Sequence, residues 1–256
     1  MLSNALVQIN SLPPQENKNL IEFPNPFEYS MTEMDLIIYK SIRETIVEEN
    51  YSNASIILDQ IYSPYLRLFI LNKLLLDFCQ CGNLGAFNFV VNSGAQVNLE
   101  NNRPLITICK SGNLSLLLSL IDFGININSN PEALYQAALN GQKEVITELI
   151  KVEVNINANN SMALRLCAQQ GLSDMVDFLI QNGADVNALD DNALMMAVVG
   201  AHVDTVRILL HHGAKPSGKN GRIFLEAKKK GLTEILDLLM CKQSEIDLHE
   251  KYMIED

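Results

Sequence analysis

The sequence is short of basic residues. Lys and Arg together number 19 against 30 Asp and Glu, so the formal net charge is -11. A field of that sign repels the phosphate backbone of nucleic acids and anionic lipid surfaces. We therefore expect no nucleic-acid partner.

A long apolar run is also missing. Spanning a bilayer takes roughly 18 to 20 uninterrupted apolar residues, and the closest stretch, residues 66–76, is broken by Arg67, Asn72 and Lys73. Residues 1–10 have neither the basic region nor the continuous apolar region of a Sec signal peptide. We expect a cytoplasmic protein without a membrane span.

An internal repeat organises most of the chain. A glycine, replaced once by alanine, recurs at intervals of 30, 29, 30, 30 and 30 residues, at Gly82, Gly112, Gly141, Gly171, Ala201 and Gly231. Seven residues before each stands a large apolar residue: Leu75, Leu105, Leu134, Leu164, Leu194 and Phe224. A fixed period of this length is typical of stacked supersecondary units. We predict six units within residues 67–243.

Each unit is predicted to be a helix pair. Apolar residues recur at helical spacing on both sides of the first glycine, as in Val176, Leu179 and Ile180. The glycine suits the left-handed end of the first helix, and Gly-Ala-x-x-Asn endings such as residues 183–187 turn the chain out of the second. A single pair cannot bury its apolar faces alone, so stability must come from stacking.

These residues resemble the ankyrin repeat, whose helix pair ends in a Gly-Ala-Asp-x-Asn-like turn. The resemblance covers about 175 of the 256 residues and implies an all-α, ankyrin-like solenoid of stacked antiparallel helix pairs. The Thr-Pro-Leu-His signature of the family survives only as Arg-Pro-Leu-Ile at residues 103–106. The period is shorter than the usual value of about 33. We expect shortened inter-repeat turns in place of β-hairpin fingers.

The N-terminal part is predicted to differ from the array. Residues 30–33 suggest a capping box that opens a helix through about Glu48, followed by a shorter helix near residues 53–62. We interpret residues 30–66 as an N-terminal helical cap or a degenerate repeat. The second interpretation aligns Ile56 and Ile57 with Met175 and Val176. Residues 1–29 contain four prolines and are predicted to be extended or partly disordered.

The C-terminal end is predicted to be polar. A terminal unit must avoid an exposed apolar face. Residues 228–230, Lys-Lys-Lys, give the first helix of the last unit a charged outer side. Residues 244–256 form an acidic tail.

Nothing in the sequence forms a catalytic or metal-binding constellation. The five cysteines are odd in number and match neither a disulfide framework nor paired CxxC zinc motifs, so we expect free thiols. Cys79, Cys109 and Cys167 stand at small-residue stacking positions, where a buried thiol is inert. His211 and His212 end a second helix, where a cation suits the helix dipole. We expect no enzyme, no cofactor and no metal.

The resemblance also implies where a partner docks, on the concave surface made by the turns and the first helices. Its positions just before the first glycine are Gln80, Lys110, Ser111, Asn140, Gln169, Gln170, Lys229 and Lys230. Its turn positions are Glu100, Asn101, Asn130, Asn159, Asn160, Asp190, Asp191 and Lys219. Polar amides of this kind favour hydrogen-bonded recognition of a protein over a modest area. Joint alanine substitution at Asn159, Asn160, Gln169 and Gln170 is expected to weaken binding without lowering stability.

The main hypothesis is a monomeric, non-enzymatic protein–protein interaction module that binds another protein. The Asn- and Ile-rich composition suggests an AT-rich genome, and the acidic tail is similar to the Glu-rich C-terminal signals of effectors that intracellular bacteria inject into host cells. This favours a secreted effector acting on a host protein. Two alternatives stay open: an unrecognised activity in residues 1–66, which contain no His and no Cys, or a self-associating scaffold.

Overall fold

The fold is all-α, as the repeat predicts. The computed structural model describes residues 31–217 and 221–253, and the regular structure of these residues consists of helices without a β-strand. None of the helices in this part of the chain is long and apolar enough to cross a bilayer. The expectations for residues 1–29, for Ser30 and for Lys219 lie outside the described residues.

The described residues divide into two compact units. Unit 1 runs to Ile108 and includes Asn113–Asn126, while unit 2 holds Cys109–Gly112 and resumes at Ile127.

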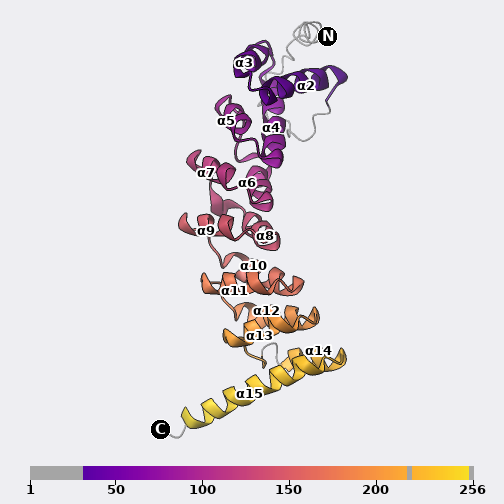
Figure 1. Cartoon of the computed structure of the whole chain (residues 1–256), viewed down its shortest axis with the longest axis vertical. Coiled ribbons are helices and arrows are strands. Elements are labelled where there is room, and N and C mark those ends of the chain that lie inside the picture. Colours follow the sequence, from indigo (N-terminus) through magenta and orange to yellow (C-terminus); the bar gives the residue numbers. More distant parts are fainter. Residues whose placement is uncertain (1–30, 218–220, 254–256) are drawn as a thin grey trace, which may run out of the picture. The chain divides into compact units, whose positions relative to one another are not determined.

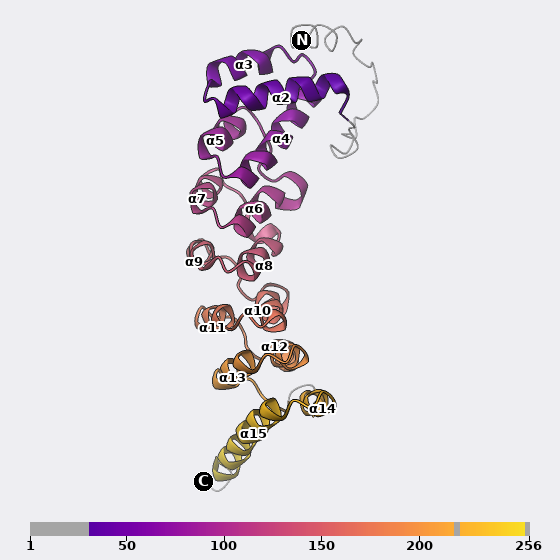
Figure 2. The same ribbon diagram turned by 45° about the vertical axis from the view of Figure 1, so that its right-hand side comes forward.

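Unit 1 is built from helices that pack in sequence order. Its helices are α2 (Glu33–Val47), α3 (Tyr51–Asp59), α4 (Pro64–Cys81), α5 (Leu84–Asn92), α7 (Leu114–Asp122) and α6 (Leu99–Ser111), the last three residues of which belong to unit 2. Helix α2 packs on α3 and α4, α4 packs on α5, and α5 packs on α7 (Figure 2).

Helix α2 begins two residues later than its sequence suggested. Thr32 is the N-cap: its Oγ1 accepts a hydrogen bond from the Asp35 backbone N–H at 3.2 Å, and the Asp35 carboxylate accepts one from the Thr32 N–H at 2.9 Å. This pair is the capping box, so placing the box at residues 30–33 was wrong. Ile38, Ile42 and Ile46 are fully buried along one face, as predicted.

The register assigned to the α2–α3 pair was also wrong. Ile56 is 56% exposed, whereas Met175, the residue aligned with it, is 3% exposed. The residue between the two helices that adopts the left-handed conformation is Glu49, with φ 59°. Glu49 lies 33 residues before Gly82, so the true alignment is shifted by three residues. The signal was hidden because glutamate, unlike glycine, does not indicate a positive φ.

Unit 2 repeats one arrangement of helix pairs. Its elements are the 3₁₀ turn η1 (Ile127–Ser129) and the helices α8 (Glu132–Leu139), α9 (Lys143–Lys151), α10 (Ala158–Gln170), α11 (Ser173–Gln181), α12 (Ala188–Val199), α13 (Val203–His211), α14 (Arg222–Lys229) and α15 (Thr233–Met253). Figure 1 shows α10 beside α11 and α12 beside α13. First helices stack on first helices, and second helices on second helices.

The core lies between successive pairs. The leading residues Leu164 and Leu194 are fully buried, and so are Cys167 and Ala197, the small residues three positions later. Small side chains at that position let neighbouring helices approach closely. In the last repeat, Lys228 is exposed at the position where the preceding repeat buries Val198. The first helix of the last repeat, α14, therefore has the predicted polar outer face at this position.

Most connections between successive repeats are short, and their residues adopt the left-handed backbone conformation. Three consecutive residues have positive φ at Glu100–Asn102, Asn159–Ser161 and Leu189–Asp191. The connection before α8 differs because Pro131 occupies the third position, and the proline ring holds φ at -63°. There the chain forms η1 instead.

The left-handed residue between the helices of each pair offers a stability test. Ala201 has φ 58° at the position where the other five repeats have glycine. Gly141 has φ 75°, and the space that a Cβ would occupy there is open. Because an L residue is strained there, Ala201→Gly should raise the free energy of unfolding by about 0.5–1 kcal/mol. Gly141→Ala should lower it by a similar amount.

Urea unfolding followed by circular dichroism measures both changes. Equal midpoints for wild type and Ala201→Gly would show that backbone strain at this position does not limit stability.

Candidate functional site

The residues predicted just before the first glycines all lie on the surface. Gln80 of unit 1 is exposed, and unit 2 exposes Lys110, Ser111, Asn140, Gln169, Gln170, Lys229 and Lys230. Lys230 also has a structural role, because its Nζ donates to the Val199 carbonyl at 2.6 Å. These positions are available for contact with a partner, each within its own unit.

The predicted turn residues separate into exposed and buried ones. Asn101, Asn159, Asn160 and Asp190 are exposed, and Glu100 is half-buried. Asn130 and Asp191 are only 7% and 3% exposed, so their assignment to the docking surface was wrong. Asn130 instead accepts a hydrogen bond at the start of α8, from the Glu132 N–H at 2.9 Å.

Asp191 is buried because it belongs to a repeated hydrogen-bonding position. We define the ladder position as the residue ten before the first glycine position of a repeat. In four repeats this residue is polar and buried: Asn72, Asn102, Ser161 and Asp191. Each of these side chains bonds the backbone of the next inter-unit turn, 24 residues further along the chain. Sequence reasoning missed this position because its residue type varies while its hydrogen-bonding role does not.

The bonds at the ladder position have ordinary lengths. Asn72 Oδ1 accepts from the Gln96 N–H at 2.9 Å, and Asn102 Nδ2 donates to the Asn126 carbonyl at 2.9 Å. Ser161 Oγ accepts from the Asp185 N–H at 3.1 Å, and Asp191 Oδ1 accepts from the Lys215 N–H at 2.8 Å.

An Asn four residues after the second glycine position of a repeat adds a second link between turns. Asn157 Oδ1 accepts from the Asp185 N–H at 2.8 Å while its Nδ2 donates to the Gly183 carbonyl at 3.0 Å. Asn128 contacts the following turn in the same way, at 2.8 Å and 3.1 Å. These asparagines join one repeat to the next, in addition to ending their own repeat.

Arg165 bonds the left-handed turn at the start of α10. Its Nε donates to the Asn160 carbonyl and its Nη2 to the Asn159 carbonyl, both at 3.0 Å. Asn159 and Asn160 have φ 52° and 58°, a conformation that alanine tolerates less well than asparagine. Alanine at these two positions is therefore expected to lower stability, so the joint substitution would not test binding alone. Gln169 and Gln170, which are helical, remain suitable for such a test.

Unit 1 contains a groove of about 390 Å³ that is lined by described residues. It lies between α4 and the turn that begins α6, and it includes the predicted residues Gln80 and Glu100. Its full lining consists of Phe69, Asn72, Lys73, Leu76, Asp77, Gln80, Leu99, Glu100, Arg103 and Thr107. The groove thus combines apolar, amide and charged side chains.

Charged side chains of the groove are partly engaged by the protein itself. Asp77 accepts a hydrogen bond from the Tyr39 hydroxyl and lies 3.5 Å from Arg43 Nε. Burial raises the pKa of the Asp77 carboxyl above its usual value. Glu100 forms an ion pair with Arg103, and the Lys73 ammonium lies 5.4 Å from the centre of the Tyr39 ring.

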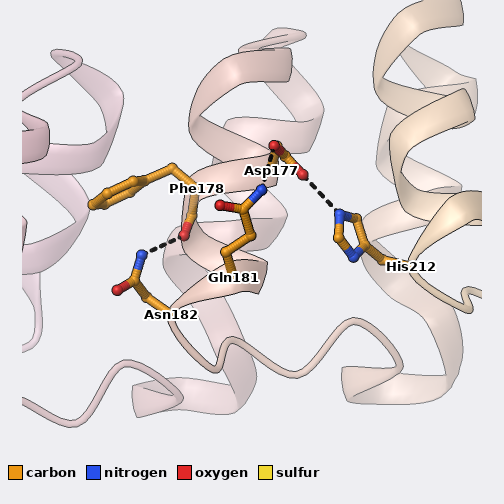
Figure 3. A network of polar contacts seen from close by, with 5 residues as sticks. All are labelled: Asp177, Phe178, Gln181, Asn182 and His212. Atoms are coloured by element: carbon orange, nitrogen blue, oxygen red, sulfur yellow. Dashed lines mark hydrogen bonds and ion pairs between the residues drawn. The ribbon is translucent and has the colours of Figure 1, made fainter.

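His212 links two neighbouring repeats. His212 Nε2 lies 2.7 Å from Asp177 Oδ1, and Gln181 Nε2 donates to the other Asp177 oxygen at 2.7 Å (Figure 3). The contact joins the end of α13 to α11. Across residues 31–217 and 221–253 there is no cluster of three or more His, Cys, Asp or Glu side chains arranged to hold a metal.

The thiols behave as their positions predict. Cys79, Cys109 and Cys167 are buried, and burial raises the pKa of each to about 12. Cys81 and Cys241 are exposed, and none of the five forms a disulfide.

A sequence comparison identifies the family of the repeat. A family model described as Ankyrin repeats (3 copies) matches residues 75–160, 105–190, 134–220 and 164–251, so that together the matches cover more than half of the chain. The four matches begin at the leading leucines Leu75, Leu105, Leu134 and Leu164. No curated protein matches the chain.

The difference in thiol environment predicts selective alkylation. In the folded protein at pH 8, iodoacetamide should modify Cys81 and Cys241 readily, while the three buried thiols should react only after denaturation, because a protonated, buried thiol is a poor nucleophile. Peptide mass spectrometry after timed quenching gives the modified positions. Rapid labelling of Cys109 in the folded protein would contradict the stacking described here.

Asp191 predicts a pH-dependent contribution to stability. Burial is the largest influence on its carboxyl and raises the pKa above 3.8, opposed by the hydrogen bond from the Lys215 N–H. A raised pKa in the folded state favours folding while the group is protonated, and this contribution is lost as pH rises through the folded-state pKa. Asp191→Asn keeps an oxygen acceptor without the charge. The variant should therefore gain stability over wild type as pH rises from 4 to 7.

Urea midpoints at several pH values measure that difference. Asp190→Asn, in the same turn but exposed, corrects for the change in net charge. A difference between wild type and Asp191→Asn that shrinks with rising pH would show the assigned sign to be wrong.

Proposed function

Because the chain belongs to the ankyrin repeat family, we propose that it binds a partner protein on the surface formed by its inter-unit turns and the ends of its first helices, and that it does so without catalysing a reaction. Repeats of this family are generally protein–protein interaction modules. The observation that carries the proposal for this chain is the groove of about 390 Å³ in unit 1, which contains two of the predicted contact residues, Gln80 and Glu100.

The backbone around this surface favours binding. The ladder position and Arg165 bond backbone groups of several turns from within the chain. A turn whose backbone is already bonded loses little conformational freedom when a partner docks. Exposed amides such as Gln80, Asn140, Gln169 and Gln170 remain on the surface for hydrogen bonds. Recognition is therefore expected to depend on side chains rather than on backbone pairing.

A finer proposal concerns the setting of this binding. We propose that the chain is a secreted bacterial effector whose partner is a host protein. The Asn- and Ile-rich composition and the acidic C-terminal residues support it. Photo-crosslinking in a eukaryotic lysate and in a bacterial lysate, run side by side, distinguishes the two settings, and an adduct formed only in the bacterial lysate would contradict the effector proposal.

Site-specific photo-crosslinking tests the docking surface itself. A photoreactive amino acid is placed at Gln80 in the groove, at Gln169 on the predicted surface of unit 2, or at Thr147, an exposed residue of the second helix α9. We expect the same adduct from Gln80 and Gln169 and none from Thr147, because the partner contacts turns and first helices.

Two further outcomes would count against the proposal. An adduct from Thr147 alone would place the partner on the second helices. An adduct whose mass equals a dimer of this chain would favour self-association. Circular dichroism of each variant checks that the reactive residue leaves the helices intact.

A further inference from the structure

Lys73 is the one cation lining the groove that has no ion pair among the described residues. Its side chain is exposed on α4, and its contact is with the ring of Tyr39 at 5.4 Å. Arg103, the other lining cation, is paired with Glu100.

Both carboxylates of the groove are already engaged. The Tyr39 hydroxyl donates to Asp77, and Arg43 Nε lies 3.5 Å from the same carboxylate. Glu100 has only 19% of its side chain exposed and is held by Arg103. Once these contacts are counted, the charge that a bound partner meets is the ammonium of Lys73. A protein with a net charge of -11 therefore presents a local cation at the groove.

Apolar surface lies next to that cation. Phe69 and Leu76 belong to the same helix as Lys73 and line the groove half-buried, and the buried Leu99 lines it from α6. Gln80 and Thr107 add hydrogen-bonding groups. An apolar side chain that packs against the half-buried Leu76 is favoured because apolar surface is removed from water.

We propose that the groove binds a segment of the partner protein in which a carboxylate side chain lies close to a large apolar side chain. The carboxylate pairs with Lys73, and the apolar side chain packs against Phe69 and Leu76. This inference rests on the proposed protein-binding function and names the chemistry of the partner.

The net charge of the chain makes the opposite partner a natural competitor. A basic segment is attracted by the overall field at long range, but on reaching the groove it finds Asp77 and Glu100 already paired. Displacing Arg43 or Arg103 would leave a cation unpaired. An acidic segment needs no such exchange.

Selection from a random heptapeptide library displayed on phage tests the proposal, with the full chain as bait. Peptides retained by the wild type should be enriched in Asp or Glu beside Leu, Ile, Phe or Trp. Binding of the selected peptides, measured by fluorescence anisotropy, should weaken roughly three- to tenfold in Lys73→Gln and further in Lys73→Glu, because an exposed ion pair is lost and then reversed.

Two variants serve as controls. Lys40→Gln removes an exposed lysine of α2 that does not line the groove, and it should leave affinity unchanged. Gln80→Trp fills the groove and should abolish binding. Thermal unfolding of each variant confirms that the fold persists.

The outcomes separate this inference from the proposed function. If Gln80→Trp abolishes binding but Lys73→Gln has no effect, the groove binds protein segments and the acidic partner is wrong. Enrichment of Lys and Arg in the selected peptides overturns the inference in the same way. Peptides that still bind Gln80→Trp place the docking site elsewhere and overturn both the inference and the use of the groove.

Discussion

Every connection between helix pairs must satisfy its backbone polar groups while two apolar faces close on each other. In this chain the ladder position meets that constraint at four connections, where a buried polar side chain of one repeat bonds the backbone of the following turn, 24 residues later. An unpaired buried backbone group would cost more than an ordinary hydrogen bond contributes. The leading leucines Leu164 and Leu194 are fully buried in repeats whose turns have these bonds.

The same constraint decides which polar residues are available to a partner. Asp191 and Asp190 are neighbours in sequence, yet one is held at the ladder position and the other is exposed. A groove forms in unit 1 where α4 and the start of α6 bring apolar side chains beside charged ones. The mixture there follows from geometry, because the first helix presents Phe69, Lys73 and Leu76 within two turns.

Much of the fold was predictable because its signals are local and periodic. The spacing of the glycines and leading leucines predicted the helix pairs, and the burial of Leu164 and Leu194 confirms that pattern. Glu49 was missed because its left-handed backbone carries no glycine, and Asp191 was misplaced because burial depends on the following unit. The groove is lined by α4 and α6, and its Asp77 is engaged by Tyr39 and Arg43 of α2. Neither residue spacing nor composition reveals such a meeting.

The left-handed turns also limit how such a chain can change its partner. A residue with positive φ is costly for most side chains, especially β-branched ones. Asn159, Asn160 and Asp190 can therefore be replaced by few alternatives without loss of stability, whereas helical positions such as Gln80 and Gln169 accept nearly any polar or apolar side chain. New specificity would arise by substitution at the ends of the first helices, while the turns keep a narrow range of residues.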